Sequence, residues 1–152
     1  RCAMEQYLKY ARILVPVDGS QESLRAVRLA GEIACRMHAT VYLLYVSPFD
    51  ESTDEGDVPW LPESIVRSAA KESHEIFVAA LKLLPNEIRH ERVHRTGAPA
   101  DEILHFIDEE GIGLVVIGGR KLSRVSGFLL GSVTQTVLEH AHSSVLIAGS
   151  TK

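Results

Sequence analysis

Two apolar runs restrict the fold of this 152-residue chain more than any other feature of its sequence. Residues 11–17 (ARILVPV) and residues 112–118 (IGLVVIG) contain almost no polar side chains and lack the alternation of a half-exposed strand. Runs of this kind, rich in Val, Ile and Leu, are typical of strands buried on both faces of a parallel sheet. The sequence therefore predicts a parallel sheet with helices on both of its faces.

Segments with helical periodicity alternate with five expected strands along the chain. Ser20 is the expected N-cap of the first helix, which runs to about His38. The expected strands are residues 11–17, 40–46, 88–95, 112–118 and 143–149, and the expected helices are residues 21–38, 62–84, 99–110 and 132–140. This alternation predicts an α/β protein with a doubly wound, open parallel sheet of five strands. The strand at 88–95 is the most polar and is expected to be the most exposed.

The composition fits one globular domain. Hydrophobic residues make up 45% of the chain, which is enough for one core, and we assign this domain to residues 11–149. Residues 1–10 are expected to be an N-terminal extension, of which residues 1–3 are expected to be left over from protein production.

Charge and cysteine usage argue against several classes of partner. A net charge of -4 gives no overall attraction for nucleic acid or anionic lipid, and no apolar run is long enough for a membrane span. The only cysteines, Cys2 and Cys35, have no ligand-like spacing, so neither a disulfide framework nor a zinc site is expected. We expect a cytoplasmic protein that binds neither nucleic acid nor membrane.

Residues suited to ligand binding follow two of the expected strands. Asp18, Gly19 and Ser20 follow the first strand, and Gly118 and Gly119 end the fourth. In doubly wound sheets, ligands bind beyond the carboxyl ends of the strands, where the strand order reverses. These two strand ends are therefore the expected place for a site.

The loop after the fourth strand has the composition of an anion site. It carries Arg120, Lys121 and Arg124 without an acidic residue, and it leads into a helix that begins near Ser132. A helix N-terminus offers unpaired N–H groups and a partial positive charge, and Gly131 would let the backbone approach a phosphate closely. The same residues also have a purely structural explanation, in which the glycines form a tight turn, the serine caps a helix and the cations face solvent.

Four stretches resemble the universal stress protein family, in the family's order and over nearly the whole chain from Arg12 to Gly149. They are RILVPVDGS at the first strand, TGAPADEI before the third helix, VVIGGRKLSRVSGFLLGSV around the basic loop and VLEHAHSSVLIAG at the last strand. The resemblance implies a flavodoxin-like or Rossmann-like sheet of strand order 3-2-1-4-5 and a homodimer that acts in the stress response. Many members hold ATP between the first and fourth strands, so a site for ATP or AMP, with or without Mg²⁺, is also implied.

The nucleotide-binding branch of this family carries a motif of Gly, two residues, Gly, nine residues, Gly, and then Ser or Thr. Gly118, Gly131 and Ser132 keep this spacing, but Lys121 stands where the family has its second glycine. A lysine in a left-handed conformation is strained by about 1 kcal/mol, whereas its ammonium group could also lie across the phosphates. The alternative to nucleotide binding is therefore a nucleotide-free dimeric interaction protein of the same family.

The resemblance also assigns roles to single residues. Asp18 matches a position that hydrogen-bonds the ribose, and Val46 matches a position whose backbone meets the adenine. From the residues alone, Asp18 can simply cap the turn before Ser20, and Val46 can be an ordinary buried valine. The full set of implied nucleotide contacts is Pro16, Val17, Asp18, Val46, Gly118, Gly119, Arg120, Lys121, Gly131, Ser132 and Val133.

Neither catalysis nor metal binding is indicated. The sequence has no Gly-x-Ser-x-Gly motif, and the turn DGSQES lacks the Ser-Gly-Gly pattern of the ATP pyrophosphatases that resemble this fold. His90 and His94 share a strand face but lie roughly 13 Å apart, too far for one metal ion. His140 and His142 are expected near a helix C-terminus, where a cation complements the helix dipole. We therefore expect a binding protein without catalytic residues, in which slow incidental ATP hydrolysis stays open.

A long acidic connection separates the second strand from the second helix. Residues 47–62 (SPFDESTDEGDVPWLP) carry five acids and show no apolar periodicity. We expect residues 49–61 to be poorly ordered or to move when a ligand binds. A rigid loop packed through Trp60 is the competing expectation.

The last expected strand predicts how the chain assembles. Ser144–Ala148 is apolar and uncharged, yet the family's strand order places it at a sheet edge with unpaired N–H and C=O groups. We expect a two-fold symmetric dimer in which two such strands run antiparallel and bury Val145 and Ile147, or Leu146. A further, unidentified protein partner is left open.

Overall fold

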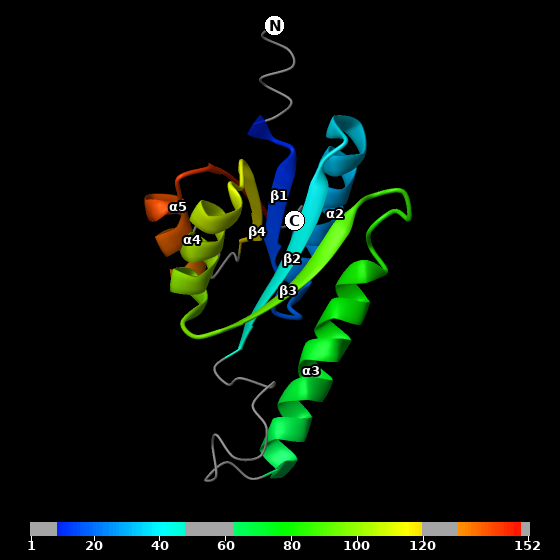
Figure 1. Cartoon of the computed structure of the whole chain (residues 1–152), viewed down its shortest axis with the longest axis vertical. Coiled ribbons are helices and arrows are strands. Elements are labelled where there is room, and N and C mark those ends of the chain that lie inside the picture. The colour runs from blue at the N-terminus through cyan, green and yellow to red at the C-terminus, as the bar shows by residue number, and fades with distance from the viewer. Residues whose placement is uncertain (1–8, 48–62, 120–130, 150–152) are drawn as a thin grey trace, which may run out of the picture.

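The computed structural model describes residues 9–47, 63–119 and 131–149. Strands and helices alternate within these residues (Figure 1). The strands are β1 (Arg12–Pro16), β2 (Thr40–Ser47), β3 (His90–Thr96), β4 (Leu114–Gly118) and β5 (Ser144–Ala148), and the helices are α2 (Gln21–Met37), α3 (Glu63–Leu81), α4 (Pro99–Glu110) and α5 (Ser132–His140). The acidic connection at residues 49–61 and the three cations of the basic loop lie outside the described residues, so the predictions made for them stay predictions.

The strands form one parallel sheet in the order β3-β2-β1-β4-β5, which confirms the predicted doubly wound architecture. Ile13 of β1 lies opposite Val41 of β2 on one side and opposite Leu114 of β4 on the other. The chain builds outward from β1 to β3 and then returns to the other side of β1 for β4 and β5. The strand order therefore reverses between β1 and β4, where sheets of this kind bind ligands.

Both faces of the sheet are buried, which explains the continuous apolar run of β1. Ile13 and Val15 belong to the core that the sheet forms with α2 and α3, whereas Leu14 belongs to the core formed with α4 and α5 (Figure 1). All three side chains are completely buried. Because successive strand residues point to opposite faces, a strand covered on both sides needs an apolar residue at every position.

The polar strand β3 forms one edge of the sheet, as its sequence predicts. Most of its residues are exposed, and it pairs with β2 along its length. It begins at His90 rather than at Ile88, because the N–H of Ile88 donates to the carbonyl of Pro85 within the preceding turn.

Helix α3 is shorter than predicted and ends at Leu81 rather than at Leu84. The N–H groups of Leu83 and Leu84 donate to carbonyls three residues earlier, so the last turn is tighter than an α-helix. Pro85 follows, and a proline disfavours the helical conformation of the residue before it.

Helix α2 is capped at both ends. Ser20 Oγ accepts a hydrogen bond from the N–H of Ser23 at 3.1 Å, and the Ser23 hydroxyl donates to the Ser20 carbonyl at 2.9 Å. At the other end, His38 adopts a left-handed conformation with φ of 53° and donates its N–H to the Ala34 carbonyl. The predicted start and end of this helix are thereby confirmed, and its first turn is fixed beside the end of β1.

The end of β4 passes so close to α2 that only a glycine fits there. A Cβ atom on Gly118 would lie 2.5 Å from the carbonyl carbon of Glu22 and 2.6 Å from its oxygen. Both are backbone atoms, which cannot rotate away as a side chain could. By contrast, a Cβ on Gly131, the N-cap of α5, would meet nothing within 4 Å, and its φ of -58° suits any residue. Of these two motif glycines, Gly118 therefore has a packing role in the described structure.

We expect Gly118→Ala to lower the free energy of unfolding by about 1–3 kcal/mol, because the added methyl group forces the backbones of β4 and α2 apart. Gly131→Ala serves as the matched control and should change it by less than about 0.5 kcal/mol. Urea denaturation without nucleotide measures both. Equal stability of the two variants would contradict the packing role of Gly118.

Candidate functional site

A cleft of about 180 Å³ lies beyond the carboxyl ends of β1, β2 and β4, at the point where the strand order reverses. The first turns of α2, α4 and α5 contribute to its walls. Its lining residues are Pro16, Val17, Asp18, Ser20, Glu22, Ser23, Leu44, Val46, Pro99, Ile103, Ile117, Gly118, Val133 and Thr134. Strand ends and helix N-termini meet here because all strands of a parallel sheet end at the same edge.

The cleft brings together many residues of the expected nucleotide site. Those that line it are Pro16, Val17, Asp18, Val46, Gly118 and Val133. Gly131 and Ser132 directly precede Val133 at the start of α5 but are not lining residues themselves. Arg120 and Lys121 lie outside the described residues. The sequence motifs therefore lead to one place in the fold.

Gly119 already uses its amide in the sheet. Its N–H donates to the carbonyl of Ala148 at 3.1 Å, which extends the pairing of β4 with β5 beyond Gly118. A phosphate contact through this amide would require that hydrogen bond to open. The first N–H groups of α5 are therefore better placed as donors.

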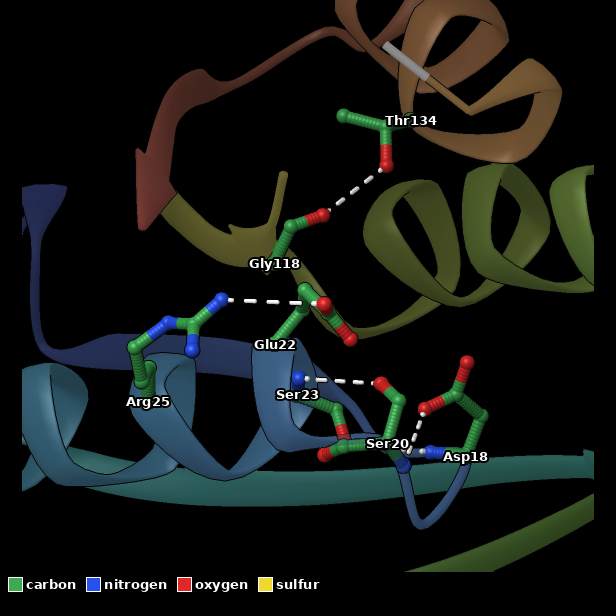
Figure 2. Close-up of polar contacts among 7 residues, drawn as sticks. All are labelled: Asp18, Ser20, Glu22, Ser23, Arg25, Gly118 and Thr134. Carbon is green, nitrogen blue, oxygen red and sulfur yellow. Dashed lines mark hydrogen bonds and ion pairs between the residues drawn. The ribbon is translucent and has the colours of Figure 1, made fainter. Parts of the chain in front are cut away.

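The N-terminus of α5 is suited to an anion. Gly131 occupies the N-cap without a side-chain hydrogen bond, and the first turn contains no acidic residue. The first N–H groups of a helix have no partner within it and can bind phosphate oxygens. Thr134 Oγ1 donates to the Gly118 carbonyl at 3.1 Å (Figure 2), which holds this turn against the end of β4.

At the two other helix N-termini of the cleft, residues of the helix itself complement the unpaired N–H groups and the positive helix dipole. Ser20 caps α2, and Glu22 lies in its first turn. Helix α4 begins with Pro99, which has no N–H, and carries Asp101 and Glu102 in its first turn. The N-terminus of α5 is therefore the helix end at the cleft that is suited to the negative charge of a ligand.

Asp18 shapes the turn after β1 and also lines the cleft. Its Oδ1 accepts a hydrogen bond from the N–H of Ser20 at 2.9 Å (Figure 2), and Gly19 between them has φ of 82°. A carboxylate that accepts the N–H two residues onward is a common way to fix such a turn. The turn-capping role is thus confirmed, whereas the ribose contact of this exposed carboxylate stays a prediction.

One wall of the cleft is apolar. It is formed by Leu44 and Val46 of β2, Pro99 and Ile103 of α4, and Ile117 of β4. From the residues alone, Val46 could have been an ordinary buried valine. In the structure its side chain is only partly buried. An apolar wall with a few polar groups beside it suits a flat ring such as a nucleobase.

Sequence reasoning missed three polar residues of the cleft, Glu22, Ser23 and Thr134. Ser23 and Thr134 each occupy the third position of a helix whose N-terminus lies at the cleft. A small hydroxyl residue at that position is a signal that could have indicated both. Glu22 carries no comparable signal, because an acid in the first turn is common in any helix.

Several histidines in the described part of the chain hydrogen-bond to groups of the protein itself. His94 Nε2 lies 2.7 Å from Ser47 Oγ, and His140 Nδ1 lies 3.0 Å from the carbonyl oxygen of Thr136. Within the described ranges, no three His, Cys, Asp or Glu side chains gather as a metal site would require. The helices of those ranges also lack an apolar stretch sufficient to span a bilayer.

Comparison with known proteins gives one consistent result. A sequence model of the universal stress protein family matches residues 9–149. A universal stress protein of Methanocaldococcus jannaschii is 32% identical over 148 residues, which cover 94% of this chain and 84% of that protein. The solved universal stress protein UspA from Lactobacillus plantarum has a TM-score of 0.69 at 25% identity, with 91% of this chain and 97% of that chain covered. A solved universal stress protein in complex with cAMP has a TM-score of 0.62 at 28% identity, with coverage of 92% and 97%.

The matched residues include every strand and helix described above, together with the motif residues Gly118, Gly131 and Ser132. The similarity therefore concerns the whole domain rather than one motif. This chain belongs to the universal stress protein family, as its sequence motifs predict.

Proposed function

We propose that this chain binds an adenine nucleotide, ATP or AMP, in the cleft between β1 and β4 and acts as a homodimeric regulatory protein in the stress response. The supporting observation is that an apolar wall, the carboxylate of Asp18 and the N-terminus of α5 meet in one cleft. These three surfaces match the three parts of a nucleotide, which are a flat base, a sugar with hydroxyl groups and an anionic phosphate.

A solved relative supports this choice of ligand. The universal stress protein in complex with cAMP shares the fold of this chain and 28% of its aligned residues. AMP and ATP share with cAMP the adenosine and a phosphate at the 5′ position. A cleft built for one of them therefore offers many of the contacts that the others need.

In the proposed complex, Asp18 accepts hydrogen bonds from the ribose hydroxyls, and the adenine lies along the wall that contains Val46. The phosphates meet the N–H groups at the start of α5, where a helix dipole favours negative charge. Arg120 and Lys121 add positive charge from the loop outside the described residues. Mg²⁺ would accompany ATP, coordinated by its phosphate oxygens.

Asp18→Asn tests the ribose contact without removing the turn. The asparagine oxygen can still accept the N–H of Ser20, so the free energy of unfolding should change by less than about 0.5 kcal/mol. Loss of the charged acceptor should weaken binding of AMP and ATP about tenfold, because hydrogen bonds to charged groups contribute about 1.5–3 kcal/mol. Isothermal titration calorimetry measures the affinities, and urea denaturation measures the stability.

Two results of this experiment have different meanings. Native protein that binds neither AMP nor ATP at millimolar ligand contradicts the nucleotide site and favours a nucleotide-free interaction protein. If the native protein binds nucleotide and the Asp18→Asn variant binds it with unchanged affinity, only the proposed role of Asp18 is contradicted.

Lys121→Gly tests the position where the family motif has its second glycine. If the lysine ammonium holds a phosphate, the variant should bind ATP about tenfold more weakly at low salt, and the difference should shrink as salt screens the charge. Calorimetry at two salt concentrations measures this. Unchanged or tighter binding would show that the lysine is tolerated without contacting the nucleotide.

We also propose that the dimer forms through β5. This strand pairs with β4 and lies at the edge of the sheet. Leu146 is 37% exposed, and Val145 and Ile147 are only partly buried. An uncharged, apolar edge strand is normally paired or protected. Antiparallel pairing of two such strands about a two-fold axis would satisfy both backbones and cover these side chains.

Leu146→Lys should dissociate the dimer, because it places a charge at the centre of the paired edge. Sedimentation equilibrium should give the native protein twice the monomer mass of 16.7 kDa and the variant the monomer mass. Leu138→Lys, at a 46% exposed leucine of α5, is the matched control and should stay dimeric. A native mass of 16.7 kDa at micromolar concentration contradicts the dimer, and dissociation by the control alone places the interface on α5 instead.

A further inference from the structure

Two kinds of contact hold helix α5 at the cleft. Val137 is completely buried in the core that the sheet forms with α4 and α5, and Val133 packs against the same core. Apolar burial is not directional, so it does not by itself fix how the first turn of the helix faces the end of β4. The hydrogen bond from Thr134 Oγ1 to the Gly118 carbonyl is directional and lies in that first turn.

Thr134 ties the first turn of α5 to the sheet. Its side chain is 7% exposed and lines the cleft, and Figure 2 shows its hydroxyl directed at the end of β4. Within the described part of the chain, the other side-chain hydrogen bonds of α5 join residues of the helix to one another. The orientation of the first turn therefore depends on this one polar contact with β4.

The acceptor of this hydrogen bond is itself firmly placed. The peptide group between Gly118 and Gly119 accepts from Thr134 through its carbonyl and donates through its N–H to the carbonyl of Ala148. Gly118 also meets the backbone of Glu22, with no room for a Cβ atom between them. The end of β4 is thus fixed by β5 and by α2, and Thr134 positions α5 relative to it.

The N–H groups that Thr134 positions are the proposed phosphate donors. The hydrogen bonds of α5 begin with the N–H of Gln135, which donates to the Gly131 carbonyl at 2.9 Å. The N–H groups of residues 132–134 therefore have no partner within the helix. A hydroxyl has one proton to donate, and that of Thr134 is donated to Gly118. Because phosphate oxygens are acceptors, Thr134 in this arrangement acts on a phosphate through the position of its helix.

We propose that Thr134 is a positioning residue whose hydrogen bond to Gly118 aims the first N–H groups of α5 at the phosphate of a bound nucleotide. This inference rests on the proposed nucleotide site. Hydrogen bonds weaken steeply as their angle departs from linear, so a small rotation of the first turn weakens all of its bonds to the phosphate. The surfaces proposed for the base and the ribose belong to other elements and are not affected by that rotation.

Thr134→Val tests this by removing the hydroxyl while keeping the shape of the side chain. Titration calorimetry with adenosine and AMP, which differ only by the phosphate, isolates the phosphate contribution to binding. We expect AMP to bind about tenfold more weakly and adenosine to stay within about twofold, because one hydrogen bond that orients the donors is lost. Thr134→Ser keeps the hydroxyl and should restore AMP binding to within about threefold of native.

Thr136→Val is the matched control. Thr136 Oγ1 donates to the Ser132 carbonyl at 2.8 Å, so the same atoms are removed from the same helix without loss of a bond to β4. Both affinities should stay within about twofold of native. Arg120, Lys121 and Arg124 are the same in all of these variants, so their contribution to phosphate binding does not affect the comparison.

Amide hydrogen exchange of the ligand-free protein separates positioning from direct contact. If Thr134 holds the first turn, the N–H of Gln135 should exchange about tenfold faster in Thr134→Val, because that turn opens more often, and at nearly the native rate in Thr134→Ser. Unchanged exchange in Thr134→Val, together with weaker AMP binding, would mean that the hydroxyl contacts the phosphate directly, and the positioning role would be wrong.

Other outcomes also overturn the inference. Equal weakening of adenosine and AMP would give Thr134 a general structural role, and unchanged AMP binding would give it none in phosphate binding. Failure of Thr134→Ser to restore AMP binding would assign the effect to the methyl group. Native protein that binds neither ligand at millimolar concentration would remove the proposed site itself, a result distinct from binding that does not depend on Thr134.

Urea denaturation checks that every variant is folded. Should Thr134→Val not fold, Thr134→Cys replaces it, because a thiol has nearly the shape of the serine hydroxyl but is a weak donor. Thr134→Cys should then bind AMP more weakly than Thr134→Ser, with adenosine binding unchanged between the two. Equal AMP binding by these two variants would contradict the positioning role.

Discussion

At the end of β4, the backbone of Gly118 packs directly against the backbone of Glu22 in the first turn of α2, with no room for a Cβ atom between them. This contact holds α2 against the sheet at the point where the strand order reverses. It also sets the position of α5, because Thr134 binds the carbonyl of the same glycine. The positions of α2 and α5 at the cleft therefore depend on one backbone approach. A change there would disturb the site and the core together, since packed interiors transmit small displacements.

The fold follows from the sequence largely because so many strand residues are buried on both faces. Ile13, Leu14 and Val15 need apolar side chains at every position, and that requirement leaves a pattern that no half-exposed strand produces. The order of the strands came from the family resemblance, because hydrophobic patterns contain no information on which strand lies beside which. Element ends were the weaker part of the prediction. Leu84 continues the apolar pattern of the helix before it, and Ile88 begins the apolar pattern of the strand after it. In the structure both lie in turns, Leu84 before Pro85 and Ile88 after it.

The sequence indicated those residues of the cleft that belong to strand ends or motifs, such as Asp18 and Gly118. The site was not predicted where a residue reaches the cleft only through packing between elements. Glu22 reads in the sequence as an ordinary first-turn acid, and its place beside Gly118 depends on how closely α2 approaches β4. Gly119 shows the reverse case. The sequence marks it as part of the glycine pair, but the register of β5 against β4 commits its amide to Ala148.

The N-termini of α2 and α5 at the cleft differ in how their unpaired N–H groups and positive dipoles are complemented. The Glu22 carboxylate complements the positive end of its own helix, an interaction that contributes about 0.3–1 kcal/mol. That stabilisation does not depend on a ligand. Helix α5 has the opposite arrangement, because its first turn has no acid and its N-cap glycine has no side chain to satisfy the free N–H groups. An anion bound at the N-terminus of α5 can therefore supply the hydrogen-bond acceptor and the negative charge that Ser20 and Glu22 supply to α2. A ligand that binds only the folded state stabilises that state, so filling the N-terminus of α5 would link nucleotide concentration to the stability of the domain.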